Sequence, residues 1–131
     1  MQATDIESAR KDLLQWSPPI IADLMVESYS IQLHITHVSR RVLCSMHARL
    51  WRLMLQEDRE KTNAARRELV DFARLAGLDK PALDAVDQAV LEELLDVVTA
   101  RFARTPDLIR VYSRLLLRTS ANLAEMRIVA C

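Results

Sequence analysis

Glycine and proline are scarce in this chain of 131 residues, which contains one glycine and four prolines. A β-sandwich or barrel needs frequent glycine, proline and Asn-Gly turns to reverse its strands. A G-x-S-x-G nucleophile elbow or a glycine-rich phosphate loop also needs more than one glycine. Good helix formers such as Leu, Ala, Arg, Glu and Met are abundant instead. The sequence therefore predicts a single all-α domain over residues 1–131, built from five or six helices.

Three further absences narrow the function. Lys plus Arg and Asp plus Glu both number 18, so the chain lacks the basic excess typical of nucleic-acid binders. No apolar run approaches the roughly 20 residues of a membrane span, and the first residues lack the apolar core of a signal peptide. The two cysteines, Cys44 and Cys131, favour free thiols in a reducing cytosol over a disulfide framework. We therefore expect a cytoplasmic protein that binds neither nucleic acid nor membranes.

Local signals predict where the helices begin and end. Thr4-Asp5-Ile6-Glu7 has the pattern of a capping box, which predicts a first helix from about Asp5 to Trp16. Ser17-Pro18-Pro19 predicts the end of that helix and the start of the next. The Ser- and Thr-rich stretch after Ser28 predicts a kink or connection near Thr36 to Ser39.

The second half of the chain contains clearer helix boundaries. A helix from about Thr62 to Ala76 is followed by Gly77, which suits the left-handed residue after a helix. Asp79-Lys80-Pro81 and Thr105-Pro106-Asp107 each combine a capping side chain with a proline in the first turn. We therefore expect two long helices at the carboxyl-terminal end.

The last two helices carry unusually broad apolar faces. The apolar arc from Val86 to Phe102 covers about 180°, whereas a one-sided surface helix needs about 100°. Such helices pack against two neighbours, and in a short chain the second neighbour can belong to another subunit or to the same monomer core. We expect a homodimer in which these helices form an intermolecular four-helix bundle. The residues expected in this interface and core are Leu94, Val97, Val98, Leu108, Tyr112, Leu115 and Leu116.

One group of residues has the chemistry of metal ligands. His34, His37, Cys44 and His47 form the pattern H-x2-H-x6-C-x2-H on one stretch of chain. Structural zinc sites generally take ligands from two converging segments, so the pattern fits either a metal or haem ligand set or ordinary polar positions on a mostly buried helix. Glu92, Glu93 and Asp96 have no accompanying E-x-x-H motif and are expected at the surface. No catalytic triad or nucleotide-binding loop is recognisable, so we expect no enzymatic activity.

The order of motifs resembles the haem-binding domains of bacterial globin-coupled sensors. Glu27-Ser28-Tyr29 matches the position of the tyrosine over the distal haem face, and Leu50-Trp51-Arg52-Leu53-Met54-Leu55 matches a later tryptophan-containing helix. Ala73-Arg74-Leu75-Ala76-Gly77-Leu78 is similar to the end of the proximal helix. Leu91-Glu92-Glu93-Leu94-Leu95 and the helix begun by Pro106 resemble the two helices through which that family dimerises.

Two departures from the family pattern bear on haem binding. Ala73 occupies the position of the proximal histidine, and no histidine follows His47 in the chain. The segment between Tyr29 and Trp51 is also shorter than in the family. The resemblance therefore implies a globin-like sensor without a haem cofactor, similar to the haem-less globin-like domains of stressosome sensors.

The function expected from these features is sensory and regulatory. The leading hypothesis is a non-enzymatic, signal-transducing globin-like domain that acts through helix packing and homodimerisation on a downstream output domain or protein. One alternative is a haem or tetrapyrrole sensor of gas or redox state with unconventional ligation by His34, His37 or His47 and with Tyr29 nearby. If haem binds, Tyr29 and His47 are the residues expected at the cofactor. Another is a helical-bundle adaptor that docks a protein partner.

Overall fold

The computed structural model describes residues 3–35 and 37–130, with side chains described for 6–35 and 38–121. This part of the chain contains five α-helices, one π-helical segment and no strand, which confirms the all-α prediction. The elements are α1 (Ala3–Glu27), η1 (Ser28–Gln32), α2 (His37–Leu55), α3 (Arg59–Leu75), α4 (Lys80–Arg101) and α5 (Pro106–Ala130). The side chain of Thr4, on which the expected capping box depends, lies outside the described residues.

Helix α1 continues through Pro18 and Pro19, so the predicted helix end at these residues was wrong. The reason is a buried stripe with a spacing of four residues, which follows one side of the helix. Its members are Ala9, Leu13, Ser17, Ile21 and Met25. Ending the helix at the prolines would divide this stripe, so core packing outweighs the backbone hydrogen bonds that two prolines remove.

The connection between α1 and α2 lies a few residues before its predicted place. The π-helical segment η1 ends at Gln32, and His34 then has a positive φ of 52°. Helix α2 begins at His37, so Ser39 is helical. Weak helix formers therefore end the helix as predicted, but the break comes earlier than Thr36 to Ser39.

Gly77 ends α3 as the sequence predicted. Its φ is +82°, and its backbone N–H donates to the carbonyl of Arg74 at 3.0 Å. The N–H of Leu78 donates to the carbonyl of Ala73 at 2.9 Å, which completes a Schellman motif. The start of α3 comes before the predicted Thr62, because the Asp58 side chain accepts a hydrogen bond from a backbone amide in the first turn.

The starts of the last two helices also agree with the sequence. The Asp79 carboxylate accepts a hydrogen bond from the backbone N–H of Ala82 at 3.0 Å, and Pro81 lies in the first turn of α4. Helix α5 begins at Pro106. These proline positions cost no helical hydrogen bond, because the first amides of a helix have no intrahelical acceptor.

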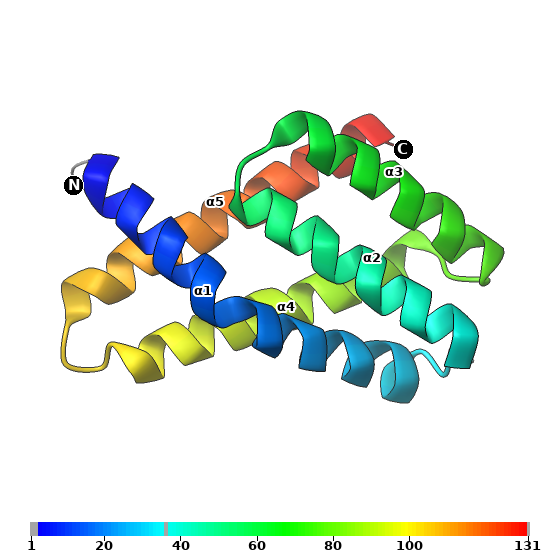
Figure 1. Ribbon diagram of the computed structural model, residues 1–131, viewed down its shortest axis with the longest axis horizontal. Helices are drawn as coiled ribbons and strands as arrows, with labels where there is room; N and C mark the ends of the chain where they lie inside the picture. Colours follow the sequence, from blue (N-terminus) through cyan, green and yellow to red (C-terminus); the bar gives the residue numbers. More distant parts are fainter. Residues whose placement is uncertain (1–2, 36, 131) are drawn as a thin grey trace.

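The helices pack as a bundle in which α1 contacts α2 and α5, α2 contacts α3, and α4 contacts α5. Figure 1 shows the α1–α2 connection and the α4–α5 connection at opposite ends of the molecule. The largest fully buried side chains are Trp51 and Tyr29. No helix in the described part of the chain is both long and apolar enough to cross a lipid bilayer.

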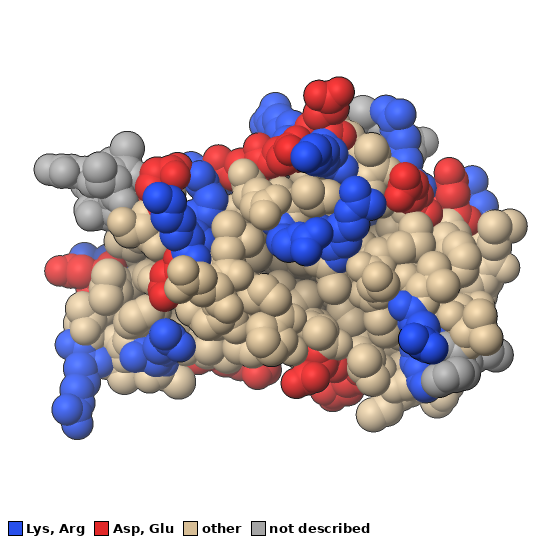
Figure 2. All heavy atoms as spheres, viewed as in Figure 1, with Lys and Arg blue, Asp and Glu red and all other residues tan. Residues whose placement is uncertain are grey.

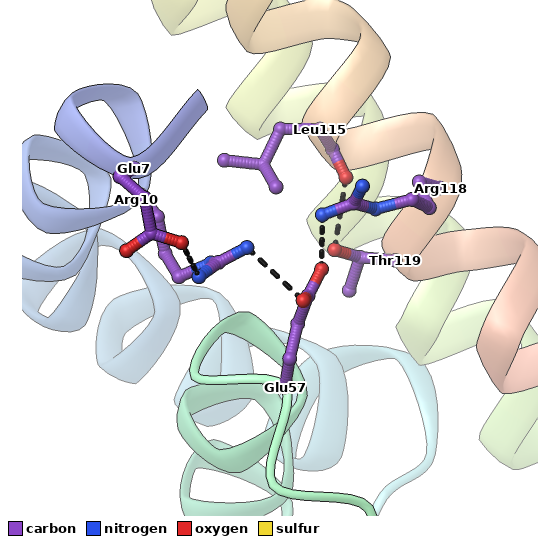
Figure 3. A network of polar contacts seen from close by, with 6 residues as sticks. All are labelled: Glu7, Arg10, Glu57, Leu115, Arg118 and Thr119. Atoms are coloured by element: carbon purple, nitrogen blue, oxygen red, sulfur yellow. Dashed lines mark hydrogen bonds and ion pairs between the residues drawn. The ribbon is translucent and has the colours of Figure 1, made fainter. Parts of the chain in front are cut away.

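A polar network joins α1 and α5 to the turn between α2 and α3 (Figure 3). Arg10 of α1 pairs with Glu7 at 2.6 Å and with Glu57 in the turn at 3.0 Å. Arg118 of α5 binds the other carboxylate oxygen of Glu57, whose φ is 58°. Partly exposed ion pairs contribute little stability individually, but a shared carboxylate fixes where the turn lies against both helices.

Candidate functional site

Five polar side chains meet inside the bundle, and none is more than 3% exposed. They come from four segments of the chain: η1, α2, α3 and α4. The residues are Tyr29, His47, Trp51, Arg66 and Asp87. We call this group the core polar network. Burial of so many polar groups is unusual in a small domain, because each must be hydrogen-bonded or paired to offset its desolvation.

Asp87 of α4 is the centre of the core polar network. Its Oδ1 atom lies 2.6 Å from Nε2 of His47 and accepts a 3.0 Å hydrogen bond from the indole N–H of Trp51. His47 and Trp51 are four residues apart, so α2 presents both to the same neighbour. The Oδ2 atom lies 3.7 Å from Nη1 of Arg66 on α3. One carboxylate therefore joins three helices.

Tyr29 extends the network to η1. Its hydroxyl lies 2.6 Å from Nδ1 of His47, and the two rings meet edge to face. With an ionised Asp87, a neutral His47 donates its Nε2–H to the carboxylate and accepts the Tyr29 O–H at Nδ1. Burial, followed by the charge of Asp87, raises the pKa of Tyr29 well above its ordinary value. Tyr29 is therefore held protonated as the donor.

A Tyr–His–Asp series of this kind can store and relay a proton. It can also hold four segments in one register, because each contact is directional and lies in a low-dielectric interior. Catalysis on a bound molecule would require access, yet Tyr29 and His47 are fully buried. The pocket between α1 and α2 is lined by other residues. In the described structure the core polar network therefore lies away from the surface and from this pocket.

The sequence singled out some of these residues and missed others. Tyr29 and His47, expected together at a haem, are in direct contact with each other. Asp87 and Arg66 were not expected. Asp87 does leave a signal in the sequence, since it interrupts the apolar stripe of α4 between Val86 and Val90, where a solvated acid would not lie. Sequence spacing alone could not show which side chain on α2 faces it.

Of the histidine pattern, His34 and Cys44 do not join this site. His34 is exposed in the α1–α2 connection, Cys44 is half-buried, and the side chain of His37 lies outside the described residues. Among the side chains that are described, no group of three or more His, Cys, Asp or Glu could hold a metal ion. As expected, Glu92, Glu93 and Asp96 are exposed on α4.

The arrangement around His47 does not fit haem ligation. Both of its ring nitrogens are engaged, one with Tyr29 and one with Asp87, so iron binding would require breaking one of these bonds. The buried side chain at the position of the proximal histidine is Ala73, which has no ligating atom. The residues at this site therefore do not fit a haem.

Most of the residues expected in the interface and core lie in the core of one chain. Five are at most 6% exposed: Leu94, Val98, Tyr112, Leu115 and Leu116. Val97 is half-buried, and Leu108 is 38% exposed. The broad apolar arcs of α4 and α5 are thus largely covered by α1 and by each other. Tyr112 also donates a 2.6 Å hydrogen bond to Asp12 of α1.

Comparisons of this chain with protein-family models, with curated proteins and with solved structures gave no match. The resemblance to globin-coupled sensors therefore rests only on the short sequence motifs described above, around Tyr29, Trp51 and Gly77 and in the last two helices. An all-helical bundle is what the structure establishes, and the globin-like arrangement stays a prediction.

Proposed function

We propose that this chain is a non-enzymatic regulatory domain that transmits a signal by changing how its helices pack. The core polar network is the observation that supports this proposal. The network would hold one packing of η1, α2, α3 and α4, and a signal would favour a second packing with the network rearranged. The change would pass to a downstream output domain or protein.

The energetics of the network favour a switching role over simple stabilisation. A buried ion pair contributes little net stability, because desolvation of the charges offsets most of their attraction. Apolar residues of similar volume would stabilise the core at least as well. What a shared carboxylate adds is specificity, since Asp87 satisfies donors from α2 and α3 only in one register. A bistable element of this kind is what a regulatory domain requires.

The indole N–H groups of the two tryptophans provide a direct test by NMR relaxation dispersion. Trp51 donates to Asp87 inside the network, whereas Trp16 donates to Asp12 at 3.1 Å outside it. We expect microsecond-to-millisecond exchange at the Trp51 indole, because a minor packing breaks its hydrogen bond. The Trp16 indole is the internal control and should show little exchange.

The substitution Asp87→Asn should change the exchange at Trp51, because it alters the balance between the two packings. The matched variant Asp96→Asn removes an exposed carboxylate from the same helix and should leave the exchange unchanged. A Trp51 indole without exchange in the wild-type protein under all conditions tested would contradict the proposal, since a single rigid packing cannot transmit a shift.

We also propose that the domain forms a homodimer through α4 and α5. Apolar surface for a second copy is available at Leu117 of α5, which is 53% exposed, and at the half-buried Val97 of α4. Light scattering at micromolar concentration should give about twice 15.0 kDa. Leu117→Arg should return the monomer, whereas Leu75→Arg at an exposed position on α3 should not. A monomeric wild-type protein would contradict this part of the proposal.

A further inference from the structure

A pocket of about 290 Å³ lies between α1 and α2, at the point where α1 passes through its two prolines. Its apolar wall includes Leu14, Ile21 and Leu55. Small-molecule sites are typically concave and mostly apolar, with a few polar groups that orient the ligand. The pocket is close to the lower end of the usual volume range for such sites.

The lining of the pocket contains polar groups that the protein leaves unsatisfied. Ser17 is fully buried, and its Oγ has no hydrogen-bond partner among the described residues. Pro18 has no N–H, so the carbonyl of Leu14 loses its usual helical donor. Ser17 and Leu14 both line the pocket. A buried hydroxyl without a partner costs free energy, which a ligand that hydrogen-bonds to it would recover.

Two arginines supply positive charge at the same pocket. Arg49 and Arg52 are exposed residues of α2 that line it. Arg49 approaches Glu68 only at 3.9 Å, which leaves its guanidinium donors available. Figure 2 shows basic side chains over the middle of α2, next to an uncharged area over α1. The pocket thus combines apolar walls, one buried hydroxyl and two guanidinium groups.

We propose that this pocket binds a small organic carboxylate with an apolar body. The carboxylate would pair with Arg52 and Arg49, because guanidinium groups match a carboxylate with two parallel hydrogen bonds. The apolar body would lie against Leu14, Ile21 and Leu55. A volume of about 290 Å³ accommodates on the order of ten water-sized groups. Octanoate, with about ten non-hydrogen atoms, is a suitable probe.

Calorimetric titration of the full chain with octanoate tests the site. We expect saturable binding of one octanoate per chain, with a dissociation constant on the order of 0.1 mM for a ligand of this size. Octan-1-ol has the apolar body without the carboxylate, and inorganic phosphate has negative charge without an apolar body. Each should bind at least about tenfold more weakly than octanoate. The proposal would be overturned by undetectable octanoate binding, or by octanol or phosphate binding as tightly as octanoate.

Three single substitutions test whether octanoate binds in this pocket. Arg52→Gln should weaken octanoate binding about tenfold, because a charged hydrogen bond is lost. Arg41→Gln, at an exposed position on α2 that does not line the pocket, should leave the affinity unchanged. Ala48→Leu fills the pocket and should abolish binding, with the melting temperature showing whether the domain is still folded.

Equal affinities of the Arg52→Gln and Arg41→Gln variants would refute the assignment of this pocket, whatever Ala48→Leu does to the fold. Octanoate binding requires neither the two packings of the core polar network nor the homodimer. A lack of octanoate binding therefore leaves the regulatory proposal untouched. Likewise, a lack of exchange at the Trp51 indole would not bear on ligand binding in the pocket.

Discussion

At the residue scale, Asp87 determines the character of the core. Its carboxylate is 3% exposed and meets His47, Trp51 and Arg66 within a shell of apolar side chains. Removing one partner from a buried charge pair leaves the other charge uncompensated, which costs far more than the pair contributes. The stability of the domain should therefore depend on Asp87, and the burial of Tyr29 should make that stability depend on pH.

Substitution of Asp87 by Asn should lower the free energy of unfolding by about 3 kcal/mol, because Arg66 loses this counter-charge and His47 keeps only a neutral amide oxygen as its acceptor. Urea denaturation monitored by circular dichroism measures the change. The exposed Asp96→Asn variant should stay within about 0.5 kcal/mol of the wild type. An Asp87→Asn variant as stable as Asp96→Asn would show that the carboxylate is not a structural centre.

Tyr29 should make the fold sensitive to alkali. Burial raises its pKa in the folded state above the ordinary value of about 10, so its contribution is complete below that pH and declines above it. Between about pH 10.5 and 11.5, wild-type stability should fall by about 1.4 kcal/mol per pH unit more than that of Tyr29→Phe. Denaturation curves across this range provide the comparison, and parallel curves would contradict the assignment.

The site was only partly predictable at this scale. Tyr29 and His47 were expected at one site only in the alternative that a haem binds, and the two side chains do touch. Their partners Asp87 and Arg66 lie on α4 and α3. In the sequence Arg66 looks like an ordinary charged residue of an amphipathic helix, and Asp87 is marked only by its place within an apolar stripe. Which helix faces which is a property of tertiary packing, and no local spacing encodes it.

At the element scale, backbone chemistry and core packing compete. Gly77 and Pro106 set helix boundaries that the sequence predicted, because left-handed φ and a missing N–H act locally. Pro18 and Pro19 carry an equally strong local signal, yet α1 continues through them. The buried stripe from Ala9 to Met25 outweighs that signal, because its contacts are lost if the helix turns away.

This competition can be measured at Pro19, which is exposed and does not line the pocket. Pro19→Ala restores a backbone donor for the carbonyl of Gln15, so it should raise the free energy of unfolding by about 1 to 2 kcal/mol. Pro106→Ala, in a first helical turn, should change it by less than about 0.5 kcal/mol. Loss of stability in Pro19→Ala would mean that α1 depends on the prolines, and urea denaturation decides between these results.

At the scale of the whole molecule, the broad apolar faces of α4 and α5 can be buried by other helices of the same chain or by a second copy of the chain. The structure shows that one chain already covers most of them, since Leu94, Val98 and Leu116 are fully buried. Periodicity could predict that these helices have two neighbours, but it could not tell a neighbour in the same chain from one in a second copy. The homodimer proposal therefore depends on the exposed surface around Leu117.

The central claim about the whole molecule is that the core polar network acts as one unit across η1, α2, α3 and α4. Tyr29 and Asp87 both bond to His47, so that histidine can transmit the effect of one to the other. Such coupling distinguishes a network from a set of independent buried contacts.

A double-mutant cycle between Tyr29→Phe and Asp87→Asn, followed by urea denaturation, measures this coupling directly. The account predicts an interaction energy of about 1 kcal/mol or more. The control cycle pairs Asp87→Asn with Tyr112→Phe, whose hydroxyl donates to Asp12 instead, and should be additive within about 0.5 kcal/mol. Additivity in both cycles would contradict the account, because the buried residues would then stabilise the fold one by one.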